Sequence, residues 1–481
     1  MPPDILYILF DLIRTLGSID FPTYDEEKCR GASLLSLSQT CRYMRQQTLP
    51  FIFREVYNWP GEGRTGDIWP ESVRPYFVEV YLRDHTIRHP RRPMTLSIAV
   101  FQALQTMPAL TRVTVRVAER LPGALLQALS SVPSLRSLKI YEARWDGPTL
   151  PTPLLFPALE SLSISIYGFD GMLPRANDID LSLETANVTT VLNAVSQTLR
   201  TLRVSGDLLN PDSFSLLSWP SLYTLTITEH PPISYISLQH LLGHMPKLEE
   251  LSALFSADLS RQDQKMMRRP FPYGQPGGAV LERKSPRLRS ITLSNLEAED
   301  PIFDQLPADL VTLKLVAGTS PVRPLSGRHR PQRRFHEAPL RYNDVLFVLS
   351  RISVLPNLVE LTLTLDHFPQ PDLIAAVASA CPRLRMLELG HVWYPRGNID
   401  LLDPLDEAFI PPLANLKNLT HLSLSLDFDI RESQVDAARW FMSRLVTLQT
   451  IAFQYEQWRY WRTHGLDEVG WETHDRSVLN H

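Results

Sequence analysis

The sequence predicts an α/β solenoid, in which short parallel strands form a curved sheet on the inside and helices pack on the outside. Three observations support this prediction. A unit of the form Pro-x-Leu-x-x-Leu-x-(Leu/Ile/Val) recurs along most of the 481 residues. Each copy ends in alternating apolar residues, which is typical of a strand. The stretches between copies have apolar residues at three- and four-residue spacing, as one face of a helix requires.

The copies of this unit follow one another at a nearly regular spacing. Clear examples are PALTRVTV (108–115), PSLRSLKI (133–140) and PALESLSI (157–164). Most copies are separated by the roughly 20 to 29 residues of leucine-rich repeats, and three of the wider gaps contain insertions. The first leucines of the copies are Leu110, Leu135, Leu159, Leu199, Leu222, Leu248, Leu288, Leu310, Leu358, Leu384, Leu419 and Leu448. We therefore predict a leucine-rich-repeat solenoid.

Each repeat is expected to contain one strand and one helix. In Leu138-Lys139-Ile140 the two apolar residues share one face of a strand, and Lys139 lies on the other. Helical patterns occur in ALLQALSS (124–131), ISLQHLLGHM (236–245), NDVLFVLSRI (343–352) and DLIAAVASA (372–380). The proline falls where the helix ends, because it cannot continue one. The alternative, unrelated amphipathic helices with leucine at chance spacing, does not explain so many copies in order.

Composition narrows the class of protein. Lys plus Arg number 48 and Asp plus Glu 52, a formal net charge of -4, which argues against a general binder of nucleic acid or anionic membranes. Three separated cysteines make a disulfide framework improbable and favour a reducing compartment. The apolar start (1–17) lacks the basic residues and cleavage site of a signal peptide, and no run is long enough to span a membrane. We expect a soluble protein of the cytoplasm, the nucleus or both.

We expect four parts in the chain. Residues 1–59 form a helical domain, and residues 60–96 a connector with an N-terminal capping strand, in which Phe77, Val80 and Leu82 take repeat positions. The solenoid covers 97–455, with mobile insertions near 261–285 and 316–340, and residues 456–481 form a C-terminal cap. The second insertion holds five arginines, which suit either a solvated loop or a phosphate-bearing or acidic partner.

The sequence predicts no residues for catalysis, metal binding or cofactor binding. His85 with His89, and His240 with His244, have the spacing of zinc ligands on a helix but lack a third ligand. Asp427 and Asp429 have no acid, base or metal partner nearby, and the glycine-rich segment 273–278 lacks the Lys-Ser/Thr of a phosphate loop. We therefore expect a protein that is not an enzyme.

The N-terminus carries a separate motif. MPPDILYILFDLI (1–13) and LLSLSQTCRYMRQQTLPFIFREVY (34–57) resemble the F-box family, whose pattern is LPxEILxxIFxxL, then a helix with L-S-x-x-C-R-x-W, then a short helix ending near LPxLYRxV. The matching residues are Pro2, Asp4, Ile5, Leu6, Leu9, Phe10, Ile13, Leu35, Leu37, Ser38, Cys41, Arg42, Leu49, Pro50, Phe51, Phe53, Arg54 and Val56. With repeats downstream, the chain resembles fungal F-box proteins, so we expect a small α-helical F-box before the solenoid.

The resemblance implies a substrate-recruiting subunit of an SCF-type ubiquitin ligase, bound to a Skp-type adaptor and through it to a cullin. Such a protein tethers substrate lysines near a ubiquitin-loaded conjugating enzyme. The implied adaptor-binding residues are Pro2, Ile5, Leu6, Leu9, Phe10, Ile13, Leu35, Leu37, Cys41, Leu49 and Pro50. Two alternatives stay open: the segment is only the cap of the solenoid, or the chain is a repeat scaffold without a ubiquitin role.

The strand positions opposite the leucines are expected to bind a substrate protein. These residues are Arg112, Thr114, Arg116, Lys139, Ser163, Arg203, Thr226, Glu250, Thr292, Glu360 and Glu388. Basic residues come early and acidic ones late, with Lys314 the exception, so the face is hypothesised to prefer a partner of complementary polarity. A chance distribution of charges is the alternative. A third hypothesis, RNA or phosphate binding by the arginine insertion, fits the acidic composition least well.

Overall fold

The computed structural model describes residues 38–58, 69–83, 98–116, 120–141, 144–148, 154–166, 180–229, 243–255, 287–294, 296, 298–316, 340–366, 369–391, 407–425, 431–455 and 470–475. The chain divides into two compact units. The first comprises Met1–Gly168 and Pro174–Leu199, and the second Phe169–Leu173 and Arg200–His481.

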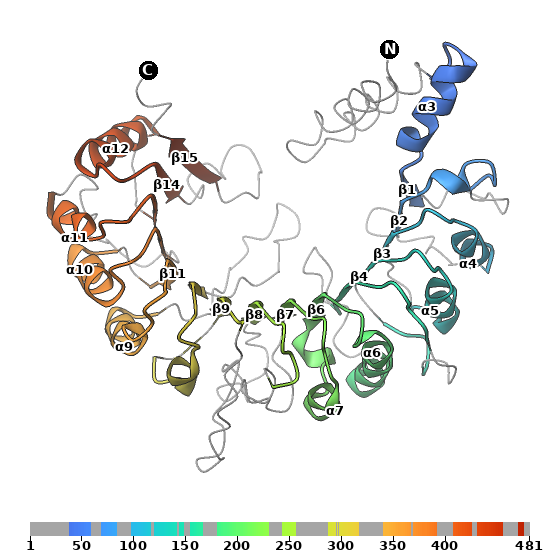
Figure 1. Ribbon diagram of the computed structural model, residues 1–481, viewed down its shortest axis with the longest axis horizontal. Coiled ribbons are helices and arrows are strands. Elements are labelled where there is room, and N and C mark those ends of the chain that lie inside the picture. Colours follow the sequence, from blue (N-terminus) through green and yellow to red (C-terminus); the bar gives the residue numbers. More distant parts are fainter. Residues whose placement is uncertain are drawn as a thin grey trace, which may run out of the picture. The chain divides into compact units, whose positions relative to one another are not determined.

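Parallel strands follow one another in chain order in the first unit. They are β1 (Glu55–Asn58), β2 (Glu79–Arg83), β3 (Arg112–Arg116), β4 (Ser137–Tyr141) and β5 (Ser161–Ile164), each paired with the next. The helices are α3 (Arg42–Ile52), η1 (Arg74–Tyr76), α4 (Ile98–Gln105), α5 (Gly123–Ser130) and α6 (Leu181–Val195). Helices α4 and α5 lie side by side, on the outer side of the strands (Figure 1).

The second unit repeats this arrangement over more strands. They are β6 (Thr201–Ser205), β7 (Thr224–Glu229), β8 (Glu250–Phe255), β9 (Ser290–Ser294), β10 (Thr312–Val316), β11 (Glu360–Leu365), β12 (Met386–His391), β13 (His421–Ser425), β14 (Thr450–Tyr455) and β15 (Gly470–Asp475). Neighbours pair in parallel from β6 to β14, and β15 runs antiparallel to β14.

Helices cover the outer side of the second unit's strands (Figure 1). They are η3 (Gly206–Leu208), α7 (Pro211–Leu216), η5 (Pro301–Gln305), α9 (Tyr342–Ile352), α10 (Pro371–Ala380), η6 (Glu407–Phe409), α11 (Ile410–Ala414) and α12 (Arg431–Arg444). Helix α10 packs against both α9 and α11, so successive repeats support one another through their helices as well as through their strands.

The leucines of the repeat pattern build the core. Every one of the first leucines named above is at most 2% exposed, and the strands β3 to β14 follow them one by one. Apolar residues of neighbouring strands stack in register, as Val113 does with Leu138 and Leu138 with Leu162. Truncating one such buried leucine to alanine costs about 2–5 kcal/mol, because it leaves a cavity.

The recurring proline lies in a tight turn between helix and strand. The Leu110 N–H donates to the Met107 carbonyl at 3.2 Å, with Pro108 as the second residue of the turn. Equivalent bonds enclose the prolines at 133, 157, 220, 246 and 382. Proline suits this turn position because its ring fixes φ near the value that the turn needs.

After α3, the last of the residues matched to the F-box pattern lies in a strand. Helix α3 ends at Ile52, and Val56 lies in strand β1, parallel to β2. The Arg54 carbonyl accepts hydrogen bonds from Val78 and Glu79, at 2.9 and 3.0 Å. A strand is favoured here because pairing with β1 supplies hydrogen-bond partners to the backbone groups along the edge of β2, which would otherwise have none in the sheet.

Both units consist of the same stacked repeat of strand, outer helix and proline turn. The chain is therefore an α/β leucine-rich-repeat solenoid, as the spacing of its leucines predicts. Phe77, Val80 and Leu82 are buried on and just before β2. Three predicted segments lie wholly or mostly outside the described residues: the insertion near 261–285, the arginine-bearing insertion apart from its end residues Val316 and Leu340, and the C-terminal segment 456–481 apart from β15.

Candidate functional site

A polar face lies opposite the leucine core. Side chains alternate along each strand, so in β4 Leu138 and Ile140 are buried while Lys139 is exposed. Since helices cover the leucine side of the strands, the polar residues occupy the inner side of each unit (Figure 1). This inner face is where the sequence predicts substrate binding.

In the first unit, one of the predicted basic residues is already paired. Arg112 is the register partner of Glu79, and its Nη2 lies 2.6 Å from Glu79 Oε2. Lys139 is exposed and has no hydrogen-bond or ion-pair partner in the part of the chain that is described. Of the predicted basic residues, Lys139 is therefore better placed than Arg112 to attract an acidic partner.

The other predicted residues of this unit lie on the same face. Thr114 and Arg116 are half-buried on β3, and Thr114 is the register partner of Lys139. Ser163 follows Lys139 in register on β5 but is only 8% exposed, so it offers little surface to a partner.

In the second unit the predicted residues fall in two adjacent rows. The first row, in register from β6 to β13, is Arg203, Thr226, Ser252, Thr292, Lys314, Thr362, Glu388 and Ser423. The second row is Thr201, Thr224, Glu250, Ser290, Thr312, Glu360, Met386 and His421. Hydroxyl groups separate the charges along both rows, and three of the charges are carboxylates.

The three carboxylates share one arrangement. Glu250 accepts a hydrogen bond from Thr224 at 3.3 Å, Glu360 from Thr312 at 3.1 Å, and Glu388 from Thr362 at 3.1 Å. In each pair the threonine is the register partner on the preceding strand. A hydroxyl holds the carboxylate in place but does not neutralise it.

These carboxylates have no cationic partner among the described residues. Lys314 lies beside them in register with Thr362, yet forms no ion pair with either Glu360 or Glu388. The inner face of the second unit therefore presents negative charge, as the order of charges in the sequence suggests for the later repeats. Arg203, counted among the early basic residues, also belongs to this unit.

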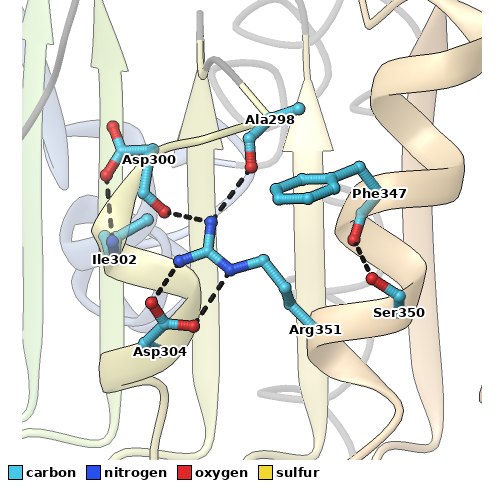
Figure 2. A network of polar contacts seen from close by, with 7 residues as sticks. All are labelled: Ala298, Asp300, Ile302, Asp304, Phe347, Ser350 and Arg351. Atoms are coloured by element: carbon cyan, nitrogen blue, oxygen red, sulfur yellow. Dashed lines mark hydrogen bonds and ion pairs between the residues drawn. The ribbon is translucent and has the colours of Figure 1, made fainter.

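The scaffold behind β10 and β11 is fixed by Arg351 of α9. Its guanidinium binds both carboxylate oxygens of Asp304 and donates to the carbonyls of Ala298, at 3.0 Å, and Asp300, at 2.8 Å (Figure 2). The same group lies 5.4 Å from the centre of the Phe303 ring. This network joins α9 to η5 of the preceding repeat.

In the first unit, a buried carboxylate joins helix α6 to the segment after β4. Glu184 of α6 is 3% exposed and accepts the backbone N–H of Trp145 with both oxygens, at 3.0 and 3.1 Å. Asn187, also on α6, donates to the Gly147 carbonyl at 3.0 Å. Burial raises the pKa of Glu184 to about 7, although the Trp145 N–H and the charges of Arg120 and Arg144 oppose the shift.

Helix α3 carries the described part of the F-box-like motif. The Cys41 Sγ caps the helix by accepting the N–H of Met44 at 3.4 Å. Leu49 is half-buried and Pro50 is exposed, whereas Phe51 is buried. The remaining predicted adaptor residues lie outside the described residues: Pro2, Ile5, Leu6, Leu9, Phe10, Ile13, Leu35 and Leu37.

Of the individual residues considered for metal binding or catalysis, only His244 lies among the described residues. His85, His89, His240, Asp427 and Asp429 lie outside the described residues. In the ranges that are described, no three His, Cys, Asp or Glu side chains gather as a metal site requires. None of the helices described there has the length and apolarity to cross a bilayer.

No protein-family model and no curated protein matches the chain. Among solved structures, the leucine-rich-repeat-containing protein LegL7 from Legionella pneumophila is similar, with 13% identity, a TM-score of 0.34, and coverage of 76% of this chain and 96% of that chain. An internalin (inlF) from Listeria monocytogenes has 12% identity, a TM-score of 0.35, and coverage of 81% and 84%. The Rad7 and Elc1 complex of yeast has 18% identity, a TM-score of 0.33, and coverage of 73% of this chain and 85% of that chain. The fold assignment rests on the repeat geometry of this chain itself.

Proposed function

We propose that the chain is the substrate-recruiting F-box subunit of an SCF-type ubiquitin ligase. Its N-terminal region binds a Skp-type adaptor, and through it a cullin, while the inner face of the repeats binds a substrate protein. Such a subunit acts in the cytoplasm, the nucleus or both, and carries no catalytic residue. It works by tethering, since holding a substrate near a loaded conjugating enzyme raises the effective concentration of its lysines.

One observation carries the proposal: the motif-bearing helix runs directly into the sheet. Helix α3 ends at Ile52 and strand β1 begins at Glu55, so only a short connection separates Pro50 from the first strand. The Phe53 ring packs edge-on against Phe77, with centroids 6.2 Å apart, which fixes the connection to the next strand. A rigid connection of this kind suits a protein that must hold substrate at a set distance from an adaptor.

Helix α3 can present motif residues while remaining anchored. Thr48 and Phe51 are buried, whereas Pro50 is exposed and Leu49 is half-exposed to solvent. Pro50 has no backbone N–H, so it donates no hydrogen bond within the last turn of the helix, and its exposed ring is available to a partner.

The second candidate is a non-catalytic repeat scaffold that binds proteins without a ubiquitin role. The pairing of β1 with β2 favours it, because β1 covers the edge that β2 would otherwise expose. Every repeat array needs such a cap, and the residues around α3 supply one whether or not they also bind an adaptor.

Co-purification with a Skp-type adaptor separates the two functions. We expect Pro50→Glu, which places a charge on an exposed motif position, to lower adaptor recovery by about tenfold or more, as loss of a central interface contact does. Gln127→Glu on α5 adds the same charge at an exposed helix position outside the motif, and should leave recovery unchanged. Equal recovery for both variants, or no recovery by the wild-type chain, would favour the scaffold.

A further inference from the structure

Two carboxylates of the second unit lie close enough to bind one cation together. Glu360 is on β11 and Glu388 on the adjacent β12, two register positions apart. With strands about 4.8 Å apart and about 3.3 Å per residue, their Cα atoms are separated by on the order of 8 Å on one face of the sheet. A single cationic group between them can reach both side chains.

Each carboxylate has one oxygen already held and one oxygen available. Thr312 donates to Oε2 of Glu360, and Thr362 donates to Oε2 of Glu388. No donor among the described residues reaches the Oε1 atom of either side chain. The threonines thus fix the two groups without using their charge, which leaves two oriented anionic acceptors.

A third polar group at this place has no partner within the described part of the chain. Ser423 on β13 is the register partner of Glu388, so it lies on the inner face of the sheet, between the buried Leu422 and Leu424. It is 9% exposed, and its Oγ atom has no hydrogen-bond partner among the residues that the structure describes. A buried hydroxyl without a partner is unfavourable by about 1–3 kcal/mol, which a ligand that hydrogen-bonds to it would recover.

We propose that Glu360, Glu388 and Ser423 form a subsite for one basic side chain, a lysine or arginine, of a protein segment lying across β11 to β13. Three acceptors match the three N–H donors of an ammonium group, and a guanidinium can bind them as well. Lys314 on the adjacent β10 leaves this part of the face with a net negative charge. The proposal rests on the inner face being the substrate-binding face, and it names the chemistry of the substrate.

The test uses the full chain and a random decapeptide library. We expect the wild-type chain to enrich peptides with lysine or arginine at one fixed position. Replacing that residue by glutamine in an enriched peptide should weaken binding about tenfold or more, as loss of a charge-assisted hydrogen bond does. In Glu360→Gln/Glu388→Gln the two peptides should bind equally well. Glutamine keeps the size of glutamate and can still accept from the threonines, so the variant should keep the wild-type melting temperature.

The matched control is Glu250→Gln. Glu250 is another threonine-held carboxylate of the same face, three strands away on β8, so this variant should still distinguish the two peptides. Several results would overturn the proposal: no enrichment, enrichment without a basic residue, or a preference that survives the double substitution. The proposal would also be overturned if the wild-type chain bound Ca²⁺ alone, or a single-stranded RNA 12-mer, more tightly than it binds the enriched basic peptide. Adaptor recovery by the double variant should equal that of the wild type, so this test and the adaptor test fail separately.

Discussion

The backbone N–H of Trp145 donates to both carboxylate oxygens of Glu184, at 3.0 and 3.1 Å. This pair joins the segment after β4 to helix α6 within the first unit. The carboxylate is buried, and burial raises its pKa to about 7, well above the ordinary value of 4.5. The folded state therefore binds a proton more tightly at Glu184 than the unfolded chain does.

This shift predicts how stability depends on pH. Because the pKa of Glu184 is higher in the folded state than in the unfolded chain, protonation of Glu184 favours the folded state. The free energy of unfolding therefore rises as the pH falls from above 7 towards 4.5. Above pH 7 the buried charge destabilises the fold by on the order of 1–3 kcal/mol. We expect Glu184→Gln to be more stable than wild type at pH 8 and close to it at pH 5, in chemical unfolding followed by circular dichroism.

A neighbouring acid supplies the control for this pH effect. Asp180 caps α6 by accepting from Ser182 and Leu183, and these hydrogen bonds lower its pKa. The charge of Asp180 is the smallest of the causes that act on the pKa of Glu184, so Asp180→Asn should change the slope between pH 5 and pH 8 far less than Glu184→Gln does. A Glu184→Gln variant with the same slope as wild type would show that Glu184 does not titrate in this range.

The Arg351 network should matter for stability. Arg351→Met removes the donors to Asp304 and leaves the Ala298 and Asp300 carbonyls without them, so we expect a loss of about 2–4 kcal/mol in the free energy of unfolding. Arg351→Lys keeps the charge but cannot bind both oxygens of Asp304 in the same planar way, and should recover only part of the loss.

Arg439 provides a matched comparison for Arg351. It forms an exposed ion pair with Asp436 on the same helix, at 3.6 Å. Arg439→Met should change the free energy of unfolding by no more than about 0.5 kcal/mol. Similar losses for the two arginines would mean that the backbone carbonyls around Arg351 contribute nothing. Amide hydrogen exchange should also show faster opening of α9 in Arg351→Met only.

Charge reversal on the inner face should separate stability from binding. Arg112→Glu places a carboxylate opposite Glu79, and like charges on neighbouring strands destabilise a sheet by about 0.5 kcal/mol.

Lys139→Glu with Arg203→Glu breaks no ion pair between described residues, so the fold should be unaffected. If these two residues attract an acidic part of the substrate, recovery of a co-purified partner should fall about tenfold and depend on salt. Unchanged recovery would leave the charges without a role in recognition.

Much of the fold follows from local spacing in the sequence. The first leucine of each repeat, such as Leu110, Leu248 or Leu448, marks where the turn and the strand of that repeat lie. A residue's position relative to that leucine therefore predicts whether it is buried. Strand β1 carries no such period and forms because β2 offers an unpaired edge, which the sequence does not show. The F-box pattern places the end of a short helix near this segment and does not predict the strand that follows.

The polar contacts of the inner face were harder to predict. The sequence singles out Glu360 and Glu388 as outward strand residues, but not the threonines that hold them. Those contacts depend on which strands are neighbours and in which register, and Thr312 and Glu360 are 48 residues apart. Aligning the repeats by their first leucines would reveal the pairing, since each threonine and its glutamate occupy the same position after the first leucine of their repeats.

Calorimetric titration of a purified Skp-type adaptor into the full chain tests the proposed function most directly. We predict one-to-one binding that is lost in Ile5→Asp/Leu9→Asp, which charges two apolar residues of the motif, while the variant keeps the wild-type melting temperature. Absence of binding by the folded wild-type chain, or equal affinity for the double variant, would contradict the account and leave a repeat scaffold whose N-terminal region serves only as a cap.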